Sequence, residues 1–234
     1  MYAPNISVGT YRDAPAINAA MGRVYFYMMT AVLNSMFVSY VVGTTPALTQ
    51  FFLTGIMHWV VVFAPLLAIF LMIPVLNADP PAPVAVGMLH GFAALMGLSM
   101  GTIFIAYAMT SIFTAFMGAA VLFATMSFYG YFTKRSLEGV GSFCFVGLIA
   151  IIIASIVNMF IGSTVMQMVI SAIAIIIFLG FTAYDTQQIR EMVSVETDNS
   201  VAVEVCGALT LYLDFINLFV NLLQIIGVAP GRDD

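Results

Sequence analysis

The fold is decided by the stretch Cys206-Gly-Ala-Leu-Thr-Leu-Tyr-Leu-Asp-Phe-Ile-Asn-Leu-Phe-Val-Asn-Leu-Leu-Gln224. It places a carboxylate inside an apolar run of membrane length. At about 100° per residue, its polar side chains fall within about 80° of one another on a helix. We call this set the polar stripe: Cys206, Thr210, Asp214, Asn217, Asn221 and Gln224. Lipid cannot solvate such a face, so we expect it to point into protein or a water-filled cavity. The sequence therefore predicts a central last helix enclosed by the others.

Composition identifies the class of protein. The 234 residues are 62% hydrophobic and 7% charged, whereas globular domains are about 25% charged. A spanning helix needs about 20 residues, so the chain has room for six to eight spans in one domain. With six basic residues, it has no patch for nucleic acid. Cys144 and Cys206 lack metal-ligand spacing and are interpreted as apolar packing residues.

Hydropathy and turn residues divide the chain into seven predicted spans and two tails. Residues 1–22 are predicted to be a disordered N-terminal tail, and residues 23–228 form the transmembrane domain. The first span is too long for a signal-peptide core and is expected to be a retained anchor. The predicted spans are 24–43, 51–76, 84–107, 112–131, 140–161, 165–185 and 202–228, with an acidic loop at 187–200 and a short C-terminal tail at 229–234.

Glycine spacing in the third span predicts close helix packing. The span contains Gly87-x-x-x-Gly91 and Gly97-x-x-x-Gly101. Small residues at this spacing let two helix backbones approach closely in a membrane. We therefore expect a neighbouring helix to pack against these glycines.

Basic residues near the span ends predict the orientation. With a cytoplasmic N-terminus, the cytoplasmic side carries Arg12, Arg23, Lys134, Arg135 and Arg190, and the opposite side carries only Arg232. This places Asp185 at the cytoplasmic end of its helix. Asp214 lies about 12 residues into the next helix, roughly 18 Å along its axis. The C-terminus is expected outside.

Asp185 and Asp214 are the candidate functional residues. Two carboxylates in one low-dielectric site cannot both ionise cheaply, so they can share a proton and titrate as a unit. No lysine or arginine lies inside a predicted span to neutralise them. The alternatives are that Asp214 only holds the bundle together through hydrogen bonds, and that Asp185 is solvated at its helix end.

Two histidines are weaker candidates. His58 and His90 both fall in predicted spans. A histidine can sense pH, but one that is packed and hydrogen-bonded between helices is the more common case.

Other function classes fit less well. An intramembrane aspartyl protease also needs two membrane aspartates, but no Gly-x-Gly-Asp surrounds Asp214. A retinal protein needs a Schiff-base lysine within a span, and Lys134, the single lysine, is in a loop. We therefore expect no catalysis. A non-conducting regulator of a membrane protease or survival pathway, docking on a membrane-protein partner, stays open beside an ion leak.

Three long motifs in order carry a family resemblance. Residues 126–139, 180–188 and 207–219 resemble the signatures of the transmembrane Bax inhibitor motif family, in its bacterial branch. The resemblance implies a seven-helix protein of the bacterial inner membrane, with its last helix enclosed by the other six. In bacterial relatives, the aspartates matching Asp185 and Asp214 form a hydrogen-bonded pair whose protonation opens or closes a calcium leak.

The second span departs from the family pattern, which can carry a glutamate that helps to bind calcium and an arginine that pairs with an aspartate. Residues 61–76 contain neither an acid nor a base. We therefore expect no resident cofactor, with calcium as a transported or weakly bound ion and Asp214 as its candidate ligand. The expected surroundings are the lipid bilayer, and we expect a monomer.

Overall fold

The computed structural model describes residues 12–195 and 201–227. All regular elements in these two ranges are α-helices: α1 (Ala14–Thr44), α2 (Pro46–Phe52), α3 (Gly55–Asn77), α4 (Ala82–Met100), α5 (Ile103–Ala106), α6 (Met109–Phe132), α7 (Glu138–Ile161), α8 (Thr164–Val195) and α9 (Val201–Ile226). Seven helices in this part of the chain are long and apolar enough to cross a membrane, with α4 and α5 counted as one span. The predicted all-α membrane fold with seven spans is confirmed.

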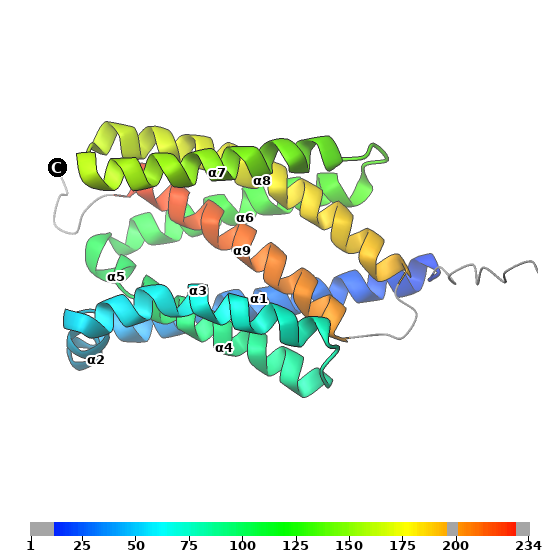
Figure 1. Cartoon of the computed structure of the whole chain (residues 1–234), viewed down its shortest axis with the longest axis horizontal. Helices are drawn as coiled ribbons and strands as arrows, with labels where there is room; N and C mark the ends of the chain where they lie inside the picture. Colours follow the sequence, from blue (N-terminus) through cyan, green and yellow to red (C-terminus); the bar gives the residue numbers. More distant parts are fainter. Residues whose placement is uncertain (1–11, 196–200, 228–234) are drawn as a thin grey trace, which may run out of the picture.

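The helices form two groups with α9 between them. Figure 1 shows α9 running diagonally between α6, α7 and α8 on one side and α1, α3 and α4 on the other. α9 packs against α1, α3, α4, α6 and α8, whereas α7 packs against α8. About 50% of the residues in the 18-residue apolar segment of α9 are buried, the largest share among the seven spans found. Enclosure of α9 by all six other spans is not confirmed, because α8 lies between α7 and α9 and α7 packs mainly against α8.

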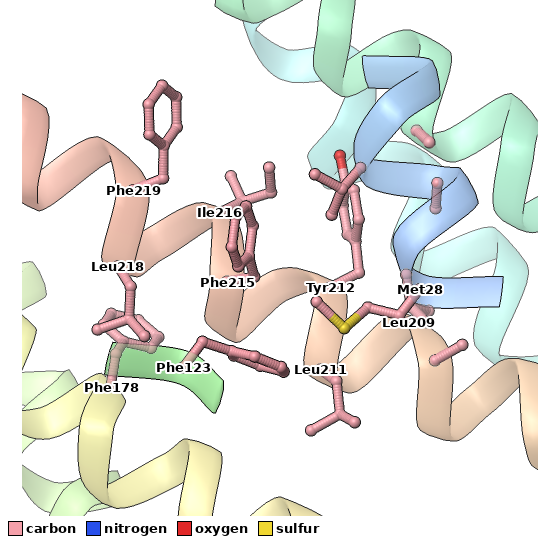
Figure 2. Close-up of a cluster of buried hydrophobic side chains, with 14 of the residues drawn as sticks. Met28, Phe123, Phe178, Leu209, Leu211, Tyr212, Phe215, Ile216, Leu218 and Phe219 are labelled. Carbon is pink, nitrogen blue, oxygen red and sulfur yellow. The ribbon is translucent and has the colours of Figure 1, made fainter. Parts of the chain in front are cut away.

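Apolar side chains on opposite sides of α9 join the two groups. Figure 2 shows Ile216 and Phe219 projecting to one side of the helix and Leu211 and Leu218 to the other, which is also the side of Phe178 of α8. All five side chains are buried. Because both sides of α9 are covered, its polar residues must find their partners inside protein.

The first helix begins earlier than predicted. Asp13 caps α1 by accepting a hydrogen bond from the Ala16 backbone N–H at 3.1 Å, and Pro15 occupies the first turn. An aspartate cap and a first-turn proline both favour a helix start. Residues 14–22 are therefore helical, and the prediction of a disordered tail is wrong for them. Residues 1–11, and the predicted C-terminal tail at 229–234, lie outside the described residues.

The sixth span also continues further than predicted. α8 runs to Val195, so the predicted loop at 187–200 is helical as far as that residue, and 196–200 lie outside the described ranges. Gln, Arg, Glu and Met, which follow Asp185, are good helix formers, and no glycine or proline interrupts them. Ile189 and Val193 are each 1% exposed. Packing of these two side chains extends α8 beyond the point where its hydropathy falls.

The two glycine pairs of α4 differ in their surroundings. A Cβ added at Gly97 would lie 2.6 Å from the Ser35 carbonyl oxygen of α1, and one at Gly101 would lie 2.9 Å from Val42. A Cβ at Gly87 or Gly91 would meet nothing within 4 Å. The prediction of close packing is confirmed for the second pair and wrong for the first.

Gly97→Ala should therefore destabilise the bundle. The new methyl group would overlap the α1 backbone, and overpacking of this kind costs about 1–3 kcal/mol. Thermal unfolding of the purified protein should show a lower midpoint, while the matched variant Gly91→Ala in the same helix should leave the midpoint unchanged or slightly raised. Equal midpoints for the two variants would contradict the close approach of α1 and α4.

Candidate functional site

The structure brings Asp185 of α8 and Asp214 of α9 together. Their carboxyl groups lie close enough to interact, and a hydrogen bond can join them when one of the two is protonated. Asp214 is 4% exposed, whereas Asp185 is half-buried. The Oδ2 atom of Asp214 is buried without a hydrogen-bond partner among the described residues. Two carboxyl groups can make such a bond only when one of them carries a proton, so this arrangement favours a proton shared between Asp185 and Asp214.

The helix lengths explain how residues at different predicted depths meet. Because α8 ends at Val195, Asp185 lies ten residues, or about 15 Å, from that end. α9 begins at Val201, so Asp214 lies 13 residues, or about 20 Å, from its start. The two carboxyls therefore reach similar depths. The expectation that Asp185 sits at a helix end is wrong, because α8 continues beyond it.

The polar stripe is mostly satisfied by its own helix. Thr210 donates to the Cys206 carbonyl at 3.1 Å, Asn217 to Leu213 at 2.8 Å, and Asn221 to Asn217 at 2.8 Å. These i to i−4 bonds need no partner from another helix. All three side chains are half-buried. Their role as pore-lining residues stays a prediction.

The far end of the stripe contacts α8 directly. The Gln224 Oε1 atom accepts hydrogen bonds from Gln167 at 2.8 Å and Ser171 at 2.5 Å. Asn158 of α7 donates to Gln167 at 3.2 Å. The stripe therefore meets α8 at both Asp214 and Gln224, and a polar network fixes the second of these contacts.

The histidines lie apart from the aspartate pair. His90 is half-buried in α4; its Nδ1 atom lies 3.0 Å from the Val86 carbonyl oxygen, and its own carbonyl accepts from Asn34 at 2.8 Å. His58 is half-buried near the start of α3, and its Nδ1 atom has no hydrogen-bond partner in the described part of the chain. Neither histidine is brought to Asp185 or Asp214.

An ion pair that the sequence reasoning missed joins α1 to α9. Arg23 donates from Nε to Glu204 Oε2 at 2.8 Å and from Nη2 to Oε1 at 2.5 Å. Glu204 is 1% exposed, and 45% of the Arg23 side chain is exposed. The expectation that no span carries a cation is wrong, because Arg23 lies within α1. A glutamate outside the polar stripe, on an otherwise apolar part of α9, is the signal that could have predicted a cationic partner.

Two further polar contacts were also missed. The hydroxyl of Tyr212 on α9 lies 2.7 Å from Ser35 Oγ, which also donates to the Ala93 carbonyl at 2.7 Å. Tyr212 is 0% exposed.

The second contact joins α1, α6 and α8. Ser127 of α6 lies 2.6 Å from the Tyr25 hydroxyl and 3.0 Å from Thr186, the residue after Asp185. Hydroxyls spread over several helices have no sequence periodicity, so only the fold brings them together.

The donor set limits what the site can bind. Calcium takes about six to eight oxygen ligands. The described residues gather no group of three or more His, Cys, Asp or Glu side chains that could hold a metal ion. Asp185 and Asp214 alone fit a proton site or a weak contact for a passing cation better than a resident calcium site.

Comparison with known proteins identifies the family. The family model "Inhibitor of apoptosis-promoting Bax1" matches residues 17–230. The inner membrane protein YbhL of Escherichia coli K12 is 36% identical over 211 residues, which cover 88% of this chain and 90% of the relative. An uncharacterized membrane protein of Streptococcus pyogenes serotype M3, SpyM3_0260, is 43% identical over 147 residues, 62% of this chain and 64% of the relative. Together with the seven apolar helices, these matches confirm the resemblance seen in the three motifs: the chain belongs to the Bax inhibitor family of integral membrane proteins.

Proposed function

We propose that this protein is a pH-sensitive cation leak pathway of the inner membrane, gated by the Asp185–Asp214 pair. The observation that carries the proposal is the close approach of the two carboxyl groups, which can be joined by a hydrogen bond when one of them is protonated. A shared proton holds α8 and α9 together at low pH. When pH rises and both groups ionise, two negative charges repel across the helix interface and favour separation.

Packing around the pair supports its role as a gate. Asp214 is buried on α9, and Asp185 is carried by α8, the two helices that also meet at Gln224. The second contact lies ten residues, or about 15 Å, further along α9. The α8–α9 interface continues past the pair to Gly207 and Ile189, so ionisation acts near the middle of this interface while the Gln224 network holds one end. The helices therefore separate at the aspartates.

The leak carries hard cations without binding calcium tightly. Carboxylate and amide oxygens suit hard cations and protons. Residues 61–76 supply no further acid, and α3 lies on the other side of α9 from α8 (Figure 1). We therefore expect calcium, sodium and protons to share the pathway, with little preference for calcium.

Flux through liposomes containing the purified protein tests this function. Calcium, sodium and proton indicators should each report a flux above that of empty liposomes, and the flux should rise with pH. If no cation flux depends on Asp214, the leak is refuted and the non-conducting regulator becomes the better account.

The orientation is proposed as N-terminus inside. The start of α1, the α6–α7 connection and the end of α8 lie at one end of the bundle (Figure 1). That end carries Arg12, Lys134, Arg135 and Arg190, and basic residues favour the cytoplasmic side. A reporter active only outside the cytoplasm, fused after Gly227, should be active. Activity of a cytoplasm-only reporter at the same position would reverse the assignment.

A further inference from the structure

A polar cavity with two cations opens at the end of the bundle where α1 begins. Its volume is about 820 Å³, and it lies between the α6–α7 connection, α8 and α1. Lys134 and Arg190 line it beside the hydroxyls of Thr133 and Ser136, and Glu191 is the one carboxylate among the described residues that line it. The lining therefore carries a net positive charge and donors that suit an anion.

Hydrogen bonds hold the α6–α7 connection against α8, and a ring contact positions Arg190. Gln187, 7% exposed, accepts from the Leu137 backbone N–H at 2.8 Å and donates to the Arg135 carbonyl at 2.9 Å, which ties the connection to α8. The Arg190 guanidinium carbon lies 5.1 Å from the centroid of the Tyr131 ring. Within residues 12–195 and 201–227 the ion pair found is Arg23–Glu204, so no carboxylate in these ranges forms an ion pair with Lys134 or Arg190.

An apolar groove continues from the polar cavity along α1 and α6. It has a volume of about 450 Å³ and is lined by apolar surface that includes Met21, Gly22 and Ala124. Asn18, Tyr131 and Phe132 line both spaces. A single elongated ligand could therefore place a charged end between the cations and an apolar end between the two helices.

We propose that this composite site binds one anionic phospholipid. Its phosphate lies between Lys134 and Arg190, and one acyl chain follows the groove between α1 and α6. The bilayer supplies such a molecule at this depth, because a basic pocket at a helix end faces the headgroups while the groove below it faces the acyl chains. A soluble anion would use the cavity and leave the groove empty. The site is separate from the aspartate pair and does not depend on the proposed leak.

Native mass spectrometry of the full chain in detergent, with phosphatidylglycerol or phosphatidylcholine titrated in, tests the headgroup half of the site. Phosphatidylglycerol should bind more tightly. Lys134→Gln and Arg190→Gln should each weaken its binding about fivefold, and the double variant about 25-fold. Arg135→Gln is the matched control, because this neighbouring cation does not line the cavity. It should change the affinity less than twofold.

Gly22→Leu tests the acyl-chain half of the site. A Cβ on Gly22 meets nothing within 4 Å, so the leucine can occupy the groove without displacing the backbone. Binding of phosphatidylglycerol should weaken at least fivefold, with no fall in the thermal unfolding midpoint. Gly87→Leu on α4, where a Cβ also meets nothing within 4 Å, should leave binding unchanged.

Three results would overturn the proposal. Equal affinity for the two lipids would remove the role of the cations, and a loss in Arg135→Gln equal to that in Lys134→Gln would show that only overall charge matters. If millimolar inorganic phosphate displaces the lipid and Gly22→Leu has no effect, the cavity is a site for soluble anions instead.

Discussion

Asp214→Asn should abolish the pH dependence of cation flux. The amide can keep a hydrogen bond to Asp185 but cannot ionise, so α8 and α9 no longer acquire two like charges as pH rises. Two unit charges about 4 Å apart repel by about 4 kcal/mol at an effective dielectric constant of about 20. That energy shifts a two-state equilibrium by roughly a thousandfold. Liposome flux measured across the pH range should change from a rising curve to a flat one.

Asp185→Asn should give the same flat profile, because the pair titrates as a unit. Glu138→Gln is the matched control: it removes one carboxylate from the exposed first turn of α7 and should leave the rising profile intact. All three variants should unfold at temperatures close to that of the unmodified chain. A rising profile retained in Asp214→Asn would contradict the gate.

Arg23→Ala should give the second large effect, a loss of stability. The substitution leaves Glu204, 1% exposed, without its bidentate cation. Breaking a fully buried pair costs about 3–5 kcal/mol, and we expect about 2 kcal/mol because the Arg23 side chain is 45% exposed. For a chain of this size, that corresponds to a fall of about 4–8 °C in the thermal midpoint.

The cost arises from the unpaired carboxylate, so a second substitution should reverse part of it. Arg23→Ala combined with Glu204→Gln should unfold at a higher temperature than Arg23→Ala alone. Arg135→Ala is the control, because it removes an exposed cation from the same end of the bundle. If Arg23→Ala unfolds at the same temperature as the unmodified protein, the ion pair contributes nothing to the stability of the α1–α9 contact.

Much of the fold was predictable because each span carries its own signal. Apolar runs of membrane length, separated by prolines and glycines, predicted seven spans without knowledge of packing. The ends of α1 and α8 were mispredicted because both helices continue past the ends of their apolar runs. Asp13 caps α1 nine residues before the predicted tail ends, and buried Ile189 and Val193 extend α8. Hydropathy does not report either effect.

The site was partly predictable for a related reason. Asp214 stands out because a carboxylate in an apolar run needs a partner, and the antiparallel neighbour supplies Asp185. Arg23 and Glu204 are 181 positions apart, and their pairing depends on where α1 crosses α9. The same holds for Tyr212 and Ser35, whose contact is tertiary. Periodicity within one helix shows which face is buried but does not identify what covers it.

Infrared spectroscopy of the protein in lipid, titrated with acid and base, tests the shared proton most directly. The protonated carboxyl group has a C=O stretch that disappears when it ionises, and subtraction of the Asp185→Asn and Asp214→Asn spectra assigns it to the pair. A shared proton should give one such band, which vanishes as pH rises and whose titration is altered by either substitution. Two bands that titrate independently, with the Asp185 band unchanged in Asp214→Asn, would contradict a shared proton.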